Sequence, residues 1–302
     1  MPLRDQLIAV SVALLWGINF LAIHAGLEHF PPVFFAALRF AVIAVPTLLL
    51  VPRPDVAWRW LLAYGLGFGT VQFGFLFVAM DVGMPTGLAS LVLQASAPFT
   101  VLLGAFLLRE SLAARQVMGI AMAVLGLVVI ATHRAQTAAL LPVVLTLLGA
   151  LGWAFGNLAS RLAQSNQPLR LVLWMSIVPP LPLFALSAVM EGPSAGWQAT
   201  GQALQGQAWT AVLGLAYVVL LGTLLGSGLW TTLMRRHPAG VVAPYSLLVP
   251  VVGMLAAWLV LAEQPDLVEL AAGAVIVLGV LLGSPRIQRT GLPQREVSAS
   301  SS

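Results

Sequence analysis

Amide and indole side chains recur at helical spacing inside two long apolar runs of the chain. Trp16 and Asn19 are three residues apart, and Trp153 and Asn157 are four apart, so each pair lies on one face of a helix. An amide donates and accepts hydrogen bonds without carrying charge, and an indole offers an apolar wall and a cation–π surface. Together these groups suit a small zwitterion with a carboxylate and an ammonium group. Buried amides also join neighbouring membrane helices, so a purely structural role stays open for each one.

Four more side chains inside apolar runs are candidates for substrate binding: Gln72, Gln94, Tyr245 and Arg39. Arg39 stands out because it places a guanidinium eight residues into the run at 32–51. A charge near the bilayer centre costs about 2.5 kcal/mol or more, so Arg39 must face protein or a wet cavity. It either binds a substrate carboxylate, or pairs with carbonyls or with a loop acid such as Asp81 or Glu28.

A second set of residues suits movement rather than binding. The candidate gating or hinge residues are His24, Pro98, Gly226 and Pro250. Proline within a span breaks helical hydrogen bonding, and glycine lets helices pack closely and slide or bend. The alternative is that these residues make static kinks that enclose a cavity.

The elements that must position these residues are membrane-spanning helices. Hydrophobic residues make up 60% of the 302-residue chain and charged residues 8%, whereas soluble domains carry about 25% charged residues. Mean hydropathy is +0.97. About 20 apolar residues cross the roughly 30 Å of hydrocarbon. The runs that qualify are 6–26, 32–51, 58–79, 86–108, 114–132, 139–161, 169–190, 208–234, 238–261 and 267–284. We therefore expect an all-α membrane protein with ten transmembrane helices.

Arginine sets the expected orientation of these helices. The chain has 14 basic residues, all of them arginine. With the N-terminus in the cytoplasm, 12 arginines lie inside, Arg134 lies outside and Arg39 lies within a span. This bias follows the rule that basic loops stay in the cytoplasm, and it predicts that both termini are cytoplasmic. The polar, basic residues 285–302 are expected to form a disordered cytoplasmic tail.

The two halves of the chain resemble each other. An offset of 153 residues aligns Pro85 with Pro238, Gly87 with Gly240, Glu110 with Glu263 and Gly126 with Gly279. Each half, 1–137 and 138–284, contains five expected spans, and because five is odd the second half is inserted upside down. Inverted five-helix repeats around a midplane site are typical of alternating-access carriers.

Several stretches also carry a family likeness. They are WGINF at 16–20, LRF at 38–40, GMPTGLASLVLQ at 83–94, VVAPYSLLVP at 241–250, and the matched Glu110 and Glu263. Over residues 6–284 the chain resembles EamA-type members of the drug/metabolite transporter superfamily, and within it the bacterial exporters of O-acetylserine, cysteine and other amino acids. The resemblance implies two inverted five-helix EamA domains, a bacterial inner-membrane location and efflux of amino acids and related small metabolites. Export of other metabolites or of drugs, with proton coupling, is the alternative.

Composition bounds the cofactors and partners. There is no cysteine, and the four histidines lie on separate segments, so we expect no metal and no cofactor. A net charge of +4 spread over many loops forms no nucleic-acid-binding stripe. The expected partners are a small-molecule substrate and the lipid bilayer. The oligomeric state stays open, and a monomer is compatible with the sequence.

The sequence also argues against an enzyme. The GPSAG string at 192–196 matches a nucleophile elbow, but it falls in a polar outer loop without strand–turn–helix context. Glu110 and Glu263 lie at span ends, where we expect them to close loops, and no acid falls securely inside a span. Ion-coupled carriers keep such groups in the membrane, so we expect gradient-driven, facilitated efflux by alternating access. A channel with inverted repeats is the remaining rival.

Overall fold

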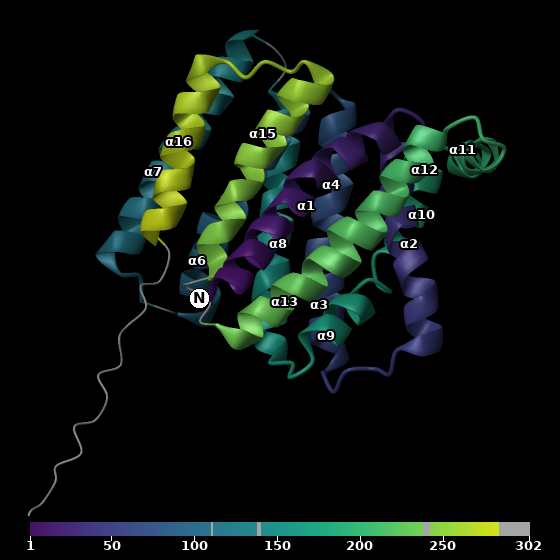
Figure 1. Cartoon of the computed structure of the whole chain (residues 1–302), viewed down its shortest axis with the longest axis horizontal. Helices are drawn as coiled ribbons and strands as arrows, with labels where there is room; N and C mark the ends of the chain where they lie inside the picture. Colours follow the sequence, from purple (N-terminus) through teal and green to yellow (C-terminus); the bar gives the residue numbers. More distant parts are fainter. Residues whose placement is uncertain (110, 138–139, 238–241, 284–302) are drawn as a thin grey trace, which may run out of the picture.

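The chain is helical wherever the structure, a computed structural model, describes it: residues 1–109, 111–137, 140–237 and 242–283 contain helices and no strand (Figure 1). Eight helical stretches are long and apolar enough to cross a membrane. They are Leu3–Leu27, Pro32–Leu50, Trp58–Asp81, Thr86–Leu108, Ala114–His133, Leu141–Ala163, Pro168–Met190 and Trp209–Met234. Two shorter apolar helices follow, Tyr245–Leu261 and Leu267–Gly283. The all-helical membrane class is confirmed, with eight candidate spans where the sequence predicted ten.

Some expectations fall on residues outside the described ranges. They are Glu110, the start of the ninth predicted span at 238–241, the repeat boundary at 138–139 and the tail at 285–302. The other predicted span ends agree with the observed helix ends to within a few residues, because apolar length is a local property of the sequence. One helix lies where only a polar loop was predicted: α11 (Ala195–Leu204).

Several spans are continuous α-helices, namely α1 (Leu3–Leu27), α2 (Pro32–Leu50), α7 (Ala114–Thr137), α8 (Leu141–Ala163) and α16 (Leu267–Gly283). Two others carry a π-helical centre. The third span consists of α3 (Trp58–Tyr64), η1 (Gly65–Gln72) and α4 (Phe73–Asp81). The eighth consists of α12 (Trp209–Ala216), η3 (Tyr217–Leu225) and α13 (Gly226–Arg236). π-Helical turns are rare and are frequent at functional sites.

Proline explains the remaining irregularities. The fourth span consists of α5 (Thr86–Val92), a 3₁₀ turn η2 (Leu93–Ala95) and α6 (Ser96–Leu108). The ninth begins with a 3₁₀ turn, η4 (Ala243–Leu247), before α15 (Leu248–Leu261). Pro98 and Pro250 are each the third residue after the 3₁₀ turn. A proline ring clashes with the carbonyl four residues earlier, and those carbonyls belong to Gln94 and Ser246, inside the two turns. The seventh span breaks similarly into α9 (Pro168–Met175) and α10 (Pro180–Met190).

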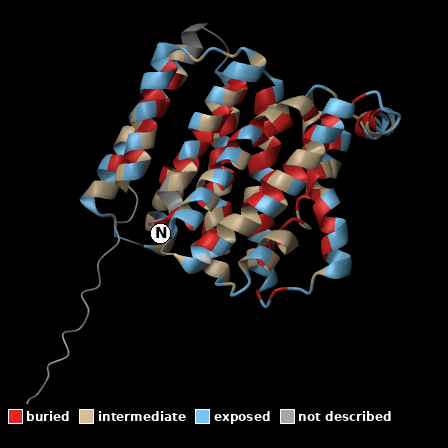
Figure 2. Ribbon diagram, viewed as in Figure 1, coloured by how far each residue is buried: buried red, intermediate tan, exposed pale blue. Residues whose placement is uncertain are grey.

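Aromatic side chains contribute to the buried core, and many large apolar side chains are exposed. Buried and exposed residues alternate along the helices (Figure 2). Phe77 contacts Phe35 in a tilted arrangement and Phe73 edge to face, with ring centroids 5.3 and 5.8 Å away. Phe106 and Val189 are at least 80% exposed. Such a surface suits a lipid solvent, in which apolar side chains face outward.

Helices α7 and α16 form a pair at one edge of the molecule (Figure 1). Glycine allows their backbones to touch. A β-carbon added to Gly279 would lie 2.6 Å from Gly119 O, and one added to Gly126 would lie 2.7 Å from Ala272 O. Any larger residue at either glycine would therefore push the two helices apart.

Candidate functional site

Trp16 and Asn19 lie together on α1, against the π segment of the eighth span. Trp16 Nε1 donates a 2.9 Å hydrogen bond to Gly222 O, and its ring lies 5.2 Å from that of Trp230. Asn19 is buried, and its Oδ1 occupies the space that a β-carbon on Gly222 would need; this oxygen has no hydrogen-bond partner among the described residues. The absence of a side chain on Gly222 is what allows Asn19 to approach. The pairing expected from the spacing therefore exists, with η3 as the opposing surface.

The corresponding pair on α8 faces the first half of the chain. The ring of Trp153 lies 6.0 Å from Phe68 of η1, and Asn157 Nδ2 donates to Thr100 Oγ1 of α6 at 3.2 Å. Both side chains are half-buried. The two tryptophan–asparagine pairs therefore lie on two different helix interfaces, α1 with η3 and α8 with η1 and α6. Each interface includes a π-helical segment.

Gln72, Gln94 and Tyr245 occupy the irregular segments themselves. Gln72 closes η1, is 2% exposed, and has an Oε1 without a partner among the described residues. Gln94 and Tyr245 lie in the two 3₁₀ turns, η2 and η4, and are half-buried. Unlike Gln72, these two side chains retain some exposure.

Arg39 is buried, with 4% of its surface exposed. Its Nη2 donates to Thr223 Oγ1 at 2.9 Å, and the Thr223 hydroxyl in turn donates to Val218 O at 2.8 Å. The guanidinium carbon lies 3.8 Å from the centre of the Phe73 ring and 5.1 Å from that of Phe40. Nε and Nη1 have no partner among the described residues.

The loop acids considered as partners of Arg39 lie elsewhere. In the described part of the chain, no ion pair includes Arg39. Glu28 lies 3.7 Å from His24, near the end of α1. Sequence reasoning missed Thr223, because nothing local distinguishes this threonine within its apolar run. Its partner lies 184 residues away, and only the packing of α2 on η3 brings the two together.

The candidate gating or hinge residues differ in how closely they contact the candidate binding residues. Gly226 touches the indole of Trp16, since an added β-carbon would lie 2.6 Å from Trp16 Nε1. Pro98 and Pro250 are buried and follow the 3₁₀ turns. His24 lies near the end of α1 with 39% of its side chain exposed, away from these contacts.

The two ends of the helical bundle are held differently. At the end where α1 starts, Asp5 accepts a 2.6 Å hydrogen bond from His237 and lies 3.7 Å from Arg236. A cavity of about 280 Å³ opens at this end between the α8–α9 connection and α13. Its lining includes Asn166, Gln167, Arg170, Thr231 and Thr232.

At the opposite end, carboxylates cap helix N-termini. Glu191 accepts hydrogen bonds from the backbone N–H groups of Val33 and Phe34 of α2, at 2.6 and 3.0 Å. Glu263 accepts two from Thr86 and Gly87 of α5, both 3.1 Å. A carboxylate stabilises the unpaired N–H groups and positive dipole of a helix N-terminus. These contacts support the expectation that Glu263 closes a loop.

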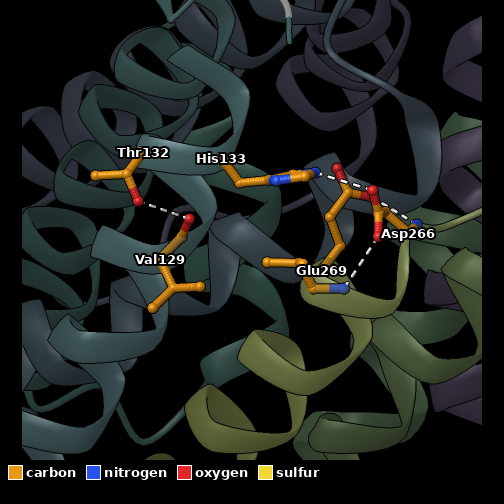
Figure 3. A network of polar contacts seen from close by, with 6 residues as sticks. Val129, Thr132, His133, Asp266 and Glu269 are labelled. Carbon is orange, nitrogen blue, oxygen red and sulfur yellow. Dashed lines mark hydrogen bonds and ion pairs between the residues drawn. The ribbon is translucent and has the colours of Figure 1, made fainter. Parts of the chain in front are cut away.

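A polar network ties α7 to α16 at this same end (Figure 3). His133 Nε2 donates to Asp266 Oδ2 at 3.0 Å, and Val268 N donates to Asp266 Oδ1 at 3.1 Å. The Val268 N–H and then the nearby His133 hold the pKa of Asp266 below its ordinary value, against an opposing effect of burial. No cluster of three or more possible metal ligands exists among the residues that the structure describes.

Comparison with known proteins identifies the family. The family model described as EamA-like transporter family matches residues 5–132 and 140–284. The chain is 40% identical over 298 residues to a Salmonella typhimurium protein named "Probable amino-acid metabolite efflux pump", covering 96% of this chain and 98% of the relative. It is 39% identical over 288 residues to an Escherichia coli K12 protein of the same name, covering 93% and 95%. A solved crystal structure with 22% identity covers 93% of this chain and 96% of its own, with a TM-score of 0.61, and shows the same fold. The chain therefore belongs to the EamA-like transporter family.

Proposed function

We propose that this protein exports amino acids and related small metabolites across the bacterial inner membrane by alternating access. The observation that carries the proposal is the similarity to two relatives named as probable amino-acid metabolite efflux pumps. The chain is 40% and 39% identical to them over nearly its full length. The interior chemistry supports it. Amide and indole groups line helix interfaces without fixed negative charge, and they suit a zwitterion that must bind and then leave.

The proposed architecture is ten spans in two inverted five-helix repeats, 1–137 and 138–284, with both termini cytoplasmic. Matched irregularities support it: a π segment in the third and eighth spans, and a 3₁₀ turn in the fourth and ninth. The glycine contacts of α7 and α16 are reciprocal as well. Gly126 approaches Ala272 O and Gly279 approaches Gly119 O, and the offset of 153 residues exchanges these two contacts.

We propose that the substrate gradient alone drives transport, so that the protein is a facilitator. Among the described residues, the buried carboxylates belong to Asp5 and Glu269, and both lie in the first turn of their helices. A proton- or ion-coupled carrier usually needs such a group inside the membrane. At zero substrate gradient, we expect that a pH gradient across proteoliposomes drives no accumulation of substrate. Uphill uptake of substrate under that condition would show that the protein is a proton-coupled exporter and not a facilitator.

The experiment that tests the substrate class is counterflow in proteoliposomes with cysteine, threonine, methionine and phenylalanine. A carrier gives saturable exchange that an internal substrate accelerates, whereas a channel gives flux that does not saturate. Exchange of a drug or another metabolite without exchange of any amino acid would refute the proposal.

The binding residues are tested in the same assay. Replacing Asn19 or Asn157 by leucine removes a polar group beside the pathway, and we expect amino-acid exchange to be abolished while the protein stays folded. Gln205→Leu, an exposed amide outside the spans, is the control and should exchange normally. Normal exchange by both asparagine variants would remove these residues from the site.

A further inference from the structure

We infer that Arg39 is the carboxylate-binding subsite of the transport pathway, so that substrates must carry a free carboxylate. This inference rests on the proposed function and deepens it by assigning one recognition element to one residue. If Arg39 binds the carboxylate, amino acids are substrates and the matching amides, esters and amines are not. Neither the family description nor the names of the relatives make this distinction.

The guanidinium of Arg39 is buried with most of its donors unused. A guanidinium has five N–H donors and no acceptor. Arg39 uses Nη2 for Thr223, while Nε and Nη1 donate to no described residue although the side chain is 96% buried, the complement of its 4% exposure. A buried charge without a counter-ion is costly and is normally found only where it serves a function. The missing partner must be an acceptor, and a carboxylate is the acceptor whose charge and shape match a guanidinium.

Two aromatic rings already hold Arg39 in place. Phe73 supports the guanidinium with its ring centre 3.8 Å away, and Phe40 lies at 5.1 Å. A cation–π contact offers the cation no oxygen acceptor, so Nε and Nη1 remain without a hydrogen-bond acceptor among the described residues. An arginine with a purely structural role would donate these N–H groups to backbone carbonyls. Here the aromatic rings hold the cation while two of its three nitrogens stay available.

The residues that hold Arg39 adjoin, along the chain, residues that carry or contact acceptors without a described partner. Thr223, the hydrogen-bond partner of Arg39, follows Gly222, which contacts both Trp16 and Asn19. Phe73 follows Gln72. Thr223 is therefore one residue from Gly222, which faces Asn19 Oδ1, and Phe73 is one residue from Gln72 with its Oε1. Both of these acceptor oxygens lack a partner among the described residues. A zwitterion needs this combination, donors for its carboxylate and acceptors for its ammonium.

The π-helical segments supply a way to uncover the buried cation. Thr223 lies in the π-helical segment η3, and its hydroxyl donates to Val218 O five residues earlier, the same spacing that π-helical backbone hydrogen bonds span. Return of η3 to an α-helical register would shift Thr223 relative to Val218 and release or redirect Arg39. Arg39 contacts η3 through Thr223 and the start of α4 through Phe73. A change of conformation in either of these two spans would therefore alter the contacts of Arg39.

The test is competition in counterflow. Radiolabelled phenylalanine, or whichever panel amino acid the wild-type protein exchanges best, is competed by its unlabelled form, by its amide and by its decarboxylated amine. The wild type should be inhibited by the free acid, and at least tenfold more weakly by the amide and the amine. Arg39→Gln should raise the half-saturating concentration of the amino acid about ten- to a hundredfold, the range expected for a charge-assisted hydrogen bond. It should also lose the preference for acid over amide, and Arg39→Lys should restore part of that preference.

Arg53→Gln is the matched control. Arg53 also stacks on an aromatic ring, 4.2 Å from Trp58, and donates one hydrogen bond, to Val56 O, but it lies in the connection between α2 and α3. This variant should keep wild-type affinity and preference. Folding is checked by thermal unfolding in detergent. Because Arg39→Gln removes an uncompensated charge, we expect it to melt no lower than wild type.

Several outcomes would overturn the inference. They are equal inhibition of the wild type by acid and amide, an unchanged half-saturating concentration in Arg39→Gln, or a large loss of thermal stability in that variant. A wild type that exchanges no amino acid refutes the proposed function instead. In that case thermal stabilisation of purified protein by a panel of organic carboxylates decides about Arg39. Stabilisation of the wild type and not of Arg39→Gln supports the subsite, and equal or absent stabilisation refutes it.

Discussion

At the scale of single residues, glycine determines how the polar side chains of α1 are held. Trp16 and Asn19 reach η3 and α13 because Gly222 and Gly226 have no side chain at the points of contact. The indole then donates to a backbone carbonyl instead of to water. Positioning of this kind depends on contacts across the bundle, so replacing a glycine should change transport without touching a polar group.

Alanine at Gly226 tests this positioning. Its β-carbon would lie 2.6 Å from Trp16 Nε1, so the indole must move, and overpacking of this kind typically costs about 1–3 kcal/mol. We expect Gly226→Ala to reduce amino-acid exchange at least severalfold. Gly228→Ala is the control, because no atom lies within 4 Å of its β-carbon and both glycines belong to α13. Equal activity of the two variants would mean that the position of Trp16 does not matter for exchange.

At the scale of elements, α7 and α16 depend on close backbone contact. Gly279→Ala would place a β-carbon 2.6 Å from Gly119 O and 2.8 Å from Ala123 N, and backbone atoms cannot yield as a flexible side chain can. We expect a loss of about 1–3 kcal/mol, seen as a melting temperature a few degrees lower in detergent. Gly283→Ala should melt like wild type, since its nearest neighbour lies at 4.0 Å. If both variants melt alike, the pair is looser than the glycine contacts indicate.

The network at the start of α16 predicts a dependence on pH (Figure 3). The pKa of Asp266 is lowered in the folded protein, so its stabilising effect is complete above the unfolded value of about 3.9 and is lost as pH falls through the folded value. Asp266→Asn should therefore melt lower than wild type at pH 5 to 7. The difference should begin to shrink below about pH 3.9 and disappear once the pH is below the folded pKa of Asp266. Thermal unfolding of both proteins across this range measures it. His133 and Glu269 share the network, so both residues are kept unchanged. A difference that persisted undiminished at pH 3 would assign the effect to packing.

At the scale of the whole molecule, the distribution of arginine predicts orientation. The absence of cysteine makes this directly measurable, because one introduced cysteine reacts without background. We expect a membrane-impermeant maleimide to label Ser194→Cys in intact cells, because the arginine distribution predicts that the connection before α11 faces the periplasm. Asn166→Cys, in the connection between α8 and α9, should react only after the membrane is opened. Both positions are exposed, so access alone decides the result. The reverse pattern would invert the proposed topology.

The whole-molecule scale also separates what was predictable from what was not. Span ends were predictable because hydrophobic length is read along the chain. The face shared by Trp16 and Asn19 was predictable from helical spacing. The π segments were not, because one extra residue in a turn leaves no clear mark on an apolar run. Helix α11 was hidden as well, since its ten residues carry too weak an apolar pattern to distinguish it from a polar loop.

The amino-acid sequence by itself determined that this is a helical membrane protein of a recognisable transporter type, and which polar side chains lie inside its helices. These are local properties, set by apolar run length and residue order. Only the tertiary structure decided that Arg39 meets Thr223 and Phe73, that Asn19 meets Gly222, and that Glu263 caps α5. Those partners are far apart in sequence, and a side chain buried in a bundle can satisfy its hydrogen bonds and charge only through the helices that pack against it.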